Sequence, residues 1–175
     1  MLVVLPDRIR RATLVNRVWF VMIFHSTRQI SAGKGNDMEF GVQVNVYRTN
    51  WDAVKASVEA MEAGDWDSVW FADHFIPPGA NHDQEALTAF EGLSAIAFAG
   101  GMTKKLRLGN LVLGNTYRNP GLTAKIAGTI DTMSEGRFTL AIGAGWYKRE
   151  HEAYGWTFPS MKERQDRFEE ACEII

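Results

Sequence analysis

Four apolar runs, each followed by a helical pattern, constrain the fold of this chain more than any other feature. Between Met38 and Ile175 we predict strands at 40–46, 68–72, 106–114 and 138–145, and helices at 51–63, about 85–99, 120–133 and 161–175. Each strand is apolar on both faces, which is typical of a parallel sheet whose two faces are covered. The alternation therefore predicts an α/β protein built from successive βα units.

Two architectures contain such units. One is a small doubly wound sheet, and the other is the first half of a (β/α)8 TIM barrel, which typically takes about 250 residues. Four strands followed by a last helix leave the sheet with an open edge, and natural proteins avoid exposing one. The half barrel is therefore the preferred interpretation. Residues 38–175 would be its first four βα units, truncated on the C-terminal side.

The first 37 residues differ in composition from the rest. They contain six of the chain's 19 Lys and Arg, two of its 21 acids and an apolar run at 18–24. This run is far shorter than the roughly 20 residues that cross a bilayer, and no small-residue cleavage site follows it. We predict that residues 1–37 are a non-native extension and that the protein starts at Met38. A targeting segment and a genuine extension are the alternatives.

Charge and cysteine content exclude several classes of function. Residues 38–175 hold the remaining 13 basic and 19 acidic residues, so this part lacks the concentrated basic face that nucleic-acid binding requires. The single cysteine, Cys172, excludes an internal disulfide and a cysteine-based zinc site, and it suits a reducing compartment. We therefore predict a cytoplasmic protein that binds neither nucleic acid nor membrane.

The predicted strands end in residues that suit ligand binding. The residues that follow or close the second, third and fourth strands are Asp73 and His74, Asn115, and Gly143, Gly145 and Trp146. The carboxyl ends of parallel strands meet at one rim, where the βα loops form binding sites. Structural roles are the alternative: Asp73 could cap its own loop, His74 could be a hydrogen-bonded loop histidine, and the glycines could only make a tight turn.

Two other groups of polar residues are predicted to lie outside any functional site. Asp73, His74, His82 and Asp83 could be combined as metal ligands, but their spacing has neither helical nor strand register, so we predict no metal site. The charged run at 150–152 is interpreted as solvated surface.

The chain resembles the luciferase-like monooxygenase superfamily in four stretches, FGVQVN, DSVWFADHF, LRLGNLVLGNTYRNPGLTAKIAGTIDTMSEGRF and LAIGAGWYKREHEAYGW. The branch that it resembles most uses the deazaflavin coenzyme F420. The likeness runs from Met38 to the last residue, and NTYRNP combined with GAGWY is its specific part. The resemblance implies a (β/α)8 barrel with the cofactor ring across the carboxyl ends of the strands.

The resemblance implies that Asp73 and His74 pack against this ring, with the imidazole near the carbon that carries the hydride. Both are therefore candidate catalytic and cofactor-binding residues. It also implies a non-proline cis peptide between Leu111 and Val112 that supports one face of the ring. Asn115 is a further cofactor-binding candidate at the same rim.

The loop after the fourth strand would wall the edge of the ring through Gly143, Gly145 and Trp146. Some sugar-phosphate dehydrogenases of the branch have an acid where Trp146 stands in this chain. Their proton donor is absent here, so their substrate is not assumed.

The predicted activity is hydride transfer between coenzyme F420 and an unidentified small organic molecule, in a protein that is a homodimer when full length. His74 would stabilise developing charge or act as a general acid or base, and Asp73 would set its tautomer or bind the cofactor through its loop. An FMN-dependent monooxygenase that uses O2 is the first alternative. A non-catalytic flavin-binding module or a truncated gene fragment is the second.

Overall fold

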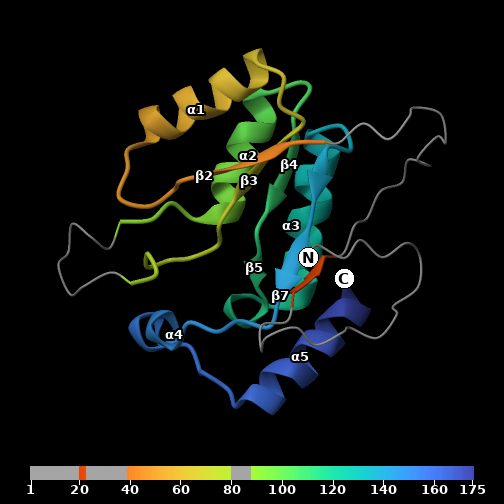
Figure 1. The fold of residues 1–175 in the computed structure, drawn as a ribbon. Helices are drawn as coiled ribbons and strands as arrows, with labels where there is room; N and C mark the ends of the chain where they lie inside the picture. The colour runs from red at the N-terminus through yellow and green to blue at the C-terminus, as the bar shows by residue number, and fades with distance from the viewer. Residues whose placement is uncertain (1–19, 23–38, 80–87) are drawn as a thin grey trace.

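A computed structural model describes the side chains and backbone of residues 39–79 and 88–175, and the backbone of residues 20–22 (Figure 1). The remainder of the predicted extension at 1–37 lies outside the described residues, as do His82 and Asp83. Within residues 1–37, the structure describes one short strand in the apolar run. The division of the chain at Met38 stays a prediction.

The elements follow one another in the alternation that the sequence predicts. In chain order they are β1 (Phe20–Met22), β2 (Gly41–Val44), α1 (Trp51–Ala63), β3 (Ser68–Phe71), α2 (Gly92–Met102), β4 (Arg107–Asn110), β5 (Leu113–Gly114), the 3-10 turn η2 (Asn115–Tyr117), α3 (Pro120–Met133), β6 (Phe138–Thr139), β7 (Ala141–Gly143), α4 (Lys148–Tyr154) and α5 (Met161–Ile174).

The main sheet is parallel, and its strands lie side by side in the order of the chain. Its order is β2-β3-β4-β6, and every pairing in it is parallel. A doubly wound sheet reverses its strand order at a switch point, whereas a barrel adds each strand beside the previous one. The order therefore favours an arc of a barrel. A second sheet has the order β1-β7-β5, in which β1 pairs antiparallel to β7.

Side-chain caps start three of the helices where the sequence predicts. The Asn50 side chain accepts from the N–H of Ala53 at 2.9 Å and starts α1. The Asn119 side chain caps α3, with Pro120 in the first turn, where its missing N–H is not needed. The Ser160 hydroxyl accepts from the third residue of α5. Each cap satisfies N–H groups that the first helical turn leaves unpaired.

Helix α2 differs from its prediction at both ends. It begins at Gly92 rather than near residue 85. Residues 88–90 instead pair with residues 46–48, which follow β2, and the N–H of Phe90 donates to the Val46 carbonyl at 3.1 Å. The carboxylate of Glu91 caps the helix, although glutamate is not among the residues preferred at this position. The predicted stop at Gly100 is wrong, because this glycine packs in the helix against Leu108.

The third and fourth predicted strands are both interrupted. A cis peptide between Leu111 and Val112 separates β4 from β5, and β6 and β7 are separate at Leu140. Buried Asn110, the last residue of β4, bonds to Ala141, the first residue of β7. Its amide donates to the Ala141 carbonyl, and its side-chain oxygen accepts from the Ala141 N–H at 3.3 Å. The cis peptide is at the predicted position. The continuous apolar pattern did not reveal the two interruptions.

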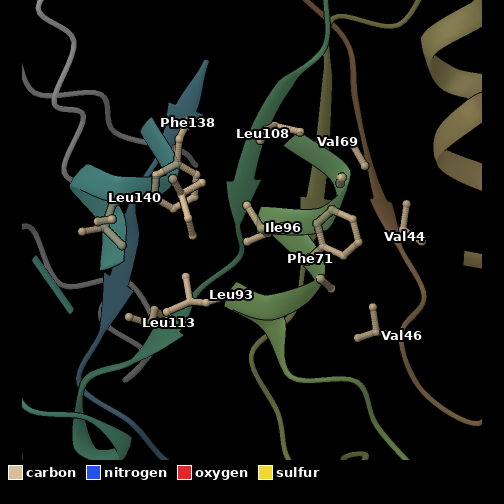
Figure 2. Packing of buried hydrophobic residues seen from close by; sticks show 14 of the residues in the cluster. Val44, Val46, Val69, Phe71, Leu93, Ile96, Leu108, Leu113, Phe138 and Leu140 are labelled. Carbon is tan, nitrogen blue, oxygen red and sulfur yellow. The ribbon is translucent and has the colours of Figure 1, made fainter. Parts of the chain in front are cut away.

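The core lies between the main sheet and the helices α1 to α3 (Figure 2). Phe71 and Leu108 point from adjacent strands toward Ile96 of α2, and all three side chains are fully buried. Trp70 points to the opposite face of the sheet. There its indole lies on Gly109, where a Cβ atom would be 2.3 Å from the ring. Within the described residues, no helix combines the length and apolar character needed to cross a bilayer.

Candidate functional site

A cavity of about 540 Å³ lies where the strands of the barrel arc end. Its walls come from Asp73 and His74 after β3, residues 111–114 around the interruption of the third strand, residues 143–146 after β7, and part of α5. Helices α4 and α5 lie at this same end of the sheet (Figure 1). The size suits a small-molecule site, since such pockets span about 300–1,000 Å³.

Asp73 is buried at this end of the sheet and is held as part of an ion cluster. Arg118 donates to both of its carboxylate oxygens at 2.8 Å, and the N–H of Gly114 donates to one of them at 2.9 Å. Arg118 also pairs with Glu91, the cap of α2. Burial lowers the pKa of Arg118, but its bonds to the two carboxylates outweigh burial and raise that pKa. Asp73 therefore joins the loops after β3 and β5.

His74 lines the same cavity as Asp73 but has different hydrogen-bond partners. Its Nδ1 lies 3.0 Å and 3.2 Å from the two carboxylate oxygens of Glu150. Its ring makes edge contacts with Trp146 and Tyr147, at centroid distances of 5.6 Å and 5.8 Å. Among the described residues, Nε2 has no hydrogen-bond partner, so it is the nitrogen left available to a ligand in the cavity that His74 lines.

Glu150 was interpreted as solvated surface, and this prediction is wrong. The residue is fully buried on α4, and its carboxylate accepts from the N–H groups of Phe75 and Ile76 at 2.6 Å and 2.9 Å and from the hydroxyl of Tyr117. Burial raises the pKa of Glu150, but hydrogen bonds from His74, Ile76 and Tyr117 outweigh it, and the net pKa is below its ordinary value. Glu150 is therefore an ionised acceptor.

His151 is also fully buried, again contrary to the prediction of a solvated run. Its Nδ1 lies 2.9 Å from the Tyr147 carbonyl and its Nε2 lies 2.8 Å from the Thr116 hydroxyl. Both ring nitrogens have partners within the protein, which makes His151 a structural residue. Its ring contacts Tyr117, Trp156 and Phe158, which the local sequence around His151 does not reveal.

The predicted ring-supporting residues lie together on one wall of the cavity. Leu111 and Val112, joined by the cis peptide, line the cavity together with Gly143 at the end of β7. A Cβ atom at Gly143 would be 2.9 Å from Val112, so only glycine fits beside it. Gly145 has a φ of +80°, and a Cβ there would be 2.4 Å from the hydroxyl oxygen of Thr116. Packing within the protein thus requires both glycines.

Of the two remaining predicted cofactor-binding residues, Trp146 lies at the cavity and Asn115 lies away from it. Trp146 lines the cavity, is 59% exposed and stacks on Tyr147. Asn115 does not line the cavity, because its side-chain amide donates to the Arg167 carbonyl at 3.1 Å and anchors α5. Among the described residues, no three His, Cys, Asp or Glu side chains gather in a way that could hold a metal ion.

An apolar wall with few polar groups fits a flat, largely apolar ring such as a flavin or deazaflavin. Leu111, Val112 and Ala144 supply the wall. The available Nε2 of His74 adds one polar group. The residues that are present are therefore compatible with such a cofactor.

Curated proteins with similar sequences include F420-dependent glucose-6-phosphate dehydrogenases. The chain is 35% identical over 125 residues to an F420-dependent glucose-6-phosphate dehydrogenase of Amycolatopsis mediterranei, covering 71% of this chain and 36% of that protein. It is 38% identical over 120 residues to the enzyme of the same name from Kineococcus radiotolerans, covering 68% and 34%. The chain thus spans about a third of the length of the curated relatives that it matches.

Solved structures share the fold. An F420-dependent secondary alcohol dehydrogenase in complex with an F420-acetone adduct aligns with a TM-score of 0.68 and 26% identity, over 78% of this chain and 40% of that one. The FMN-containing oxygenating constituent of 3,6-diketocamphane monooxygenase, from a plasmid of Pseudomonas putida, aligns with a TM-score of 0.61 over 78% and 38%, and at 22% identity it supports the fold alone. The architecture is therefore the first four βα units of a luciferase-like TIM barrel. The model of the luciferase-like monooxygenase family matches residues 18–175, and the chain belongs to that family.

Proposed function

We propose that the full-length protein transfers hydride between coenzyme F420 and a small organic substrate, with the deazaflavin ring in the cavity at the strand ends. The observation that carries this proposal is the position of His74, which lines the same cavity as Leu111 and Val112. Among the described residues, its Nε2 has no hydrogen-bond partner and is available to a ligand. The F420-dependent relatives support this choice of cofactor over FMN.

Different residues of the chain would bind the cofactor ring and accept the substrate proton. Leu111, Val112 and Gly143 would hold the ring, and Trp146 would cover its edge. The coenzyme, when bound, supplies the hydride chemistry. An alcohol that loses a hydride from carbon must also lose the proton of its hydroxyl group, and Nε2 of His74 can accept that proton. Asp73 stays bonded to Arg118, so we assign it the structural task of holding the loop.

The proposal also covers the substrate class, the location and the oligomeric state of the protein. A small molecule is the proposed substrate, and we propose a cytoplasmic homodimer that does not bind nucleic acid. Analytical ultracentrifugation of the full-length protein tests the dimer. A sedimentation coefficient that corresponds to a monomer at micromolar concentration would exclude it.

Cofactor titration of the full-length protein tests the proposed function. We expect F420 to bind at least about tenfold more tightly than FMN, a difference of about 1.4 kcal/mol. Fluorescence of each cofactor reports binding, and loss of F420 absorbance reports its reduction, with 2-propanol and glucose 6-phosphate as probe substrates. Preference for FMN together with O2 consumption would instead indicate a monooxygenase. Binding of a cofactor without turnover of either probe would indicate a non-catalytic flavin-binding module, and binding of neither cofactor would remove the proposed function.

Replacing His74 separates catalysis from cofactor binding. We expect His74→Ala to lower kcat by about 10²–10⁴, the usual contribution of general acid–base catalysis, while the Kd for F420 changes only a few-fold. His74→Gln, which can still hydrogen-bond to Glu150, should preserve the fold and lose the same activity. Full turnover by either variant would remove His74 from the mechanism.

A further inference from the structure

We infer that Glu150 is the positioning residue for His74: it holds the imidazole in the tautomer with the proton on Nδ1 and leaves Nε2 as the acceptor that faces the cavity. The proposed function assigned no role to Glu150. The catalytic consequence of this inference rests on the proposed function, whereas the tautomer itself does not.

The first step is the charge state of Glu150. Two backbone N–H groups and the hydroxyl of Tyr117 point at its carboxylate, in addition to His74. An ionised carboxylate only accepts hydrogen bonds, whereas a protonated one would have to donate one bond itself. Burial and then the hydrogen bond to Glu150 raise the pKa of Tyr117, so this hydroxyl keeps its proton and donates. Three donors therefore point at the carboxylate apart from His74, and the pKa of Glu150 lies below its ordinary value, so the carboxylate is ionised.

The second step is the tautomer of His74. Because Glu150 only accepts, Nδ1 must carry the proton in the bond of 3.0 Å. A neutral imidazole has one donor and one acceptor nitrogen, and the partner of one nitrogen fixes the role of the other. Nε2 is then a lone-pair acceptor. This is the state that a base needs in order to take a proton from a substrate hydroxyl.

The third step excludes the other carboxylate that is close in sequence. Asp73 directly precedes His74, and the sequence suggested it as the group that sets the tautomer. Its oxygens are occupied by Arg118 and by the N–H of Gly114. The aromatic neighbours of His74 are Tyr47, Trp146 and Tyr147, and they make ring contacts with it. Among the described residues, Glu150 is thus the one hydrogen-bond partner of the His74 side chain.

Glu150→Gln makes the inference testable, because the two side chains have the same shape. The N–H groups of Phe75 and Ile76 still need an acceptor, so the carboxamide oxygen should face them and its NH2 group should face His74. That NH2 donates to Nδ1, which must then be unprotonated. We therefore expect the neutral tautomer of His74 to reverse, with the proton on Nε2.

Nitrogen-15 NMR of the full-length protein without cofactor reads the tautomer directly. In the wild type, at a pH where His74 is neutral, we expect a pyrrole-type shift for Nδ1 and a pyridine-type shift for Nε2. The two types should exchange in Glu150→Gln. Loss of signals in His74→Gln assigns the resonances. With F420 and a turned-over probe substrate, kcat of Glu150→Gln should fall by about 10²–10⁴, with little change in the Kd for F420.

Glu152→Gln is the matched control, because Glu152 lies on the same helix, is 62% exposed and pairs only with Lys148 among the described residues. In Glu152→Gln, the tautomer of His74 and the kcat should equal those of the wild type. Tyr117→Phe removes one donor but keeps the carboxylate, so the wild-type tautomer should persist.

Two results would overturn the inference. One is a wild-type His74 with its proton on Nε2, a measurement that does not depend on whether any variant folds. The other is a folded Glu150→Gln protein that keeps the wild-type tautomer. Failure of the proposed function looks different: the tautomer reverses as expected, but wild-type protein neither binds nor reduces F420. That result leaves the role of Glu150 in place and removes the hydride chemistry.

Discussion

Replacing Arg118 by alanine is expected to lower the free energy of unfolding by about 3–5 kcal/mol, the usual cost of leaving one partner of a buried ion pair alone. The Asp73 side chain is 1% exposed and that of Arg118 is 11% exposed. Without the guanidinium, the N–H of Gly114 is the one donor to the Asp73 carboxylate that remains among the described residues. Urea denaturation followed by circular dichroism measures the loss.

Two further variants at arginines separate charge from geometry. Arg118→Lys keeps the charge but cannot donate to both oxygens of Asp73 in a fork, so an intermediate loss is expected. Arg167→Ala removes an exposed arginine that pairs with Glu163 one turn away, and it should cost no more than about 0.5 kcal/mol. A loss below 1 kcal/mol in Arg118→Ala would contradict the assignment of Asp73 as a structural residue.

The second large effect on stability is expected from a core substitution in β3, the strand that precedes Asp73. Phe71→Ala should lower the free energy of unfolding by about 3–5 kcal/mol, because a fully buried ring is removed and the surrounding side chains cannot close the cavity. Phe71 is the last residue of β3, and its carbonyl accepts from the N–H of Leu111 at 2.8 Å. The substitution therefore acts directly beneath the cis peptide wall of the cavity.

Phe98→Ala is the control for this prediction. Phe98 is 50% exposed on α2 and mainly makes an edge contact with Trp51 at 4.9 Å. Losing that contact should cost about 0.5–1.5 kcal/mol. Equal losses in the two alanine variants would mean that Phe71 is not packed as the structure describes.

Local signals in the sequence were sufficient for much of the fold. The predicted starts of α1 and α3 follow Asn50 and Asn119, whose side chains accept from N–H groups two or three residues along the chain and so cap these helices. The parallel strands followed from their apolar character on both faces. The position of Asp73 and His74 at the rim followed from strand direction alone, and the cis peptide between Leu111 and Val112 was expected from resemblance.

The partners of the rim residues could not be predicted, because they are distant in sequence. Glu150 lies 76 residues from His74, and its charged neighbours in the chain suggest a solvated surface. Arg118 lies 45 residues from Asp73, and it could equally have paired with any other carboxylate at the rim. Which carboxylate holds which cation depends on how the loops fold over the strand ends, and single-sequence patterns do not report this.

The placement of Glu150 has a consequence for how loops can be exchanged between barrels of this kind. Its carboxylate, on the segment after β7, binds backbone groups after β3 and the Tyr117 hydroxyl after β5. Three βα loops are thus joined through one side chain. A graft of residues 146–156 into another barrel would carry a buried acid without its donors, so substrate redesign here has to move the three loops as one module.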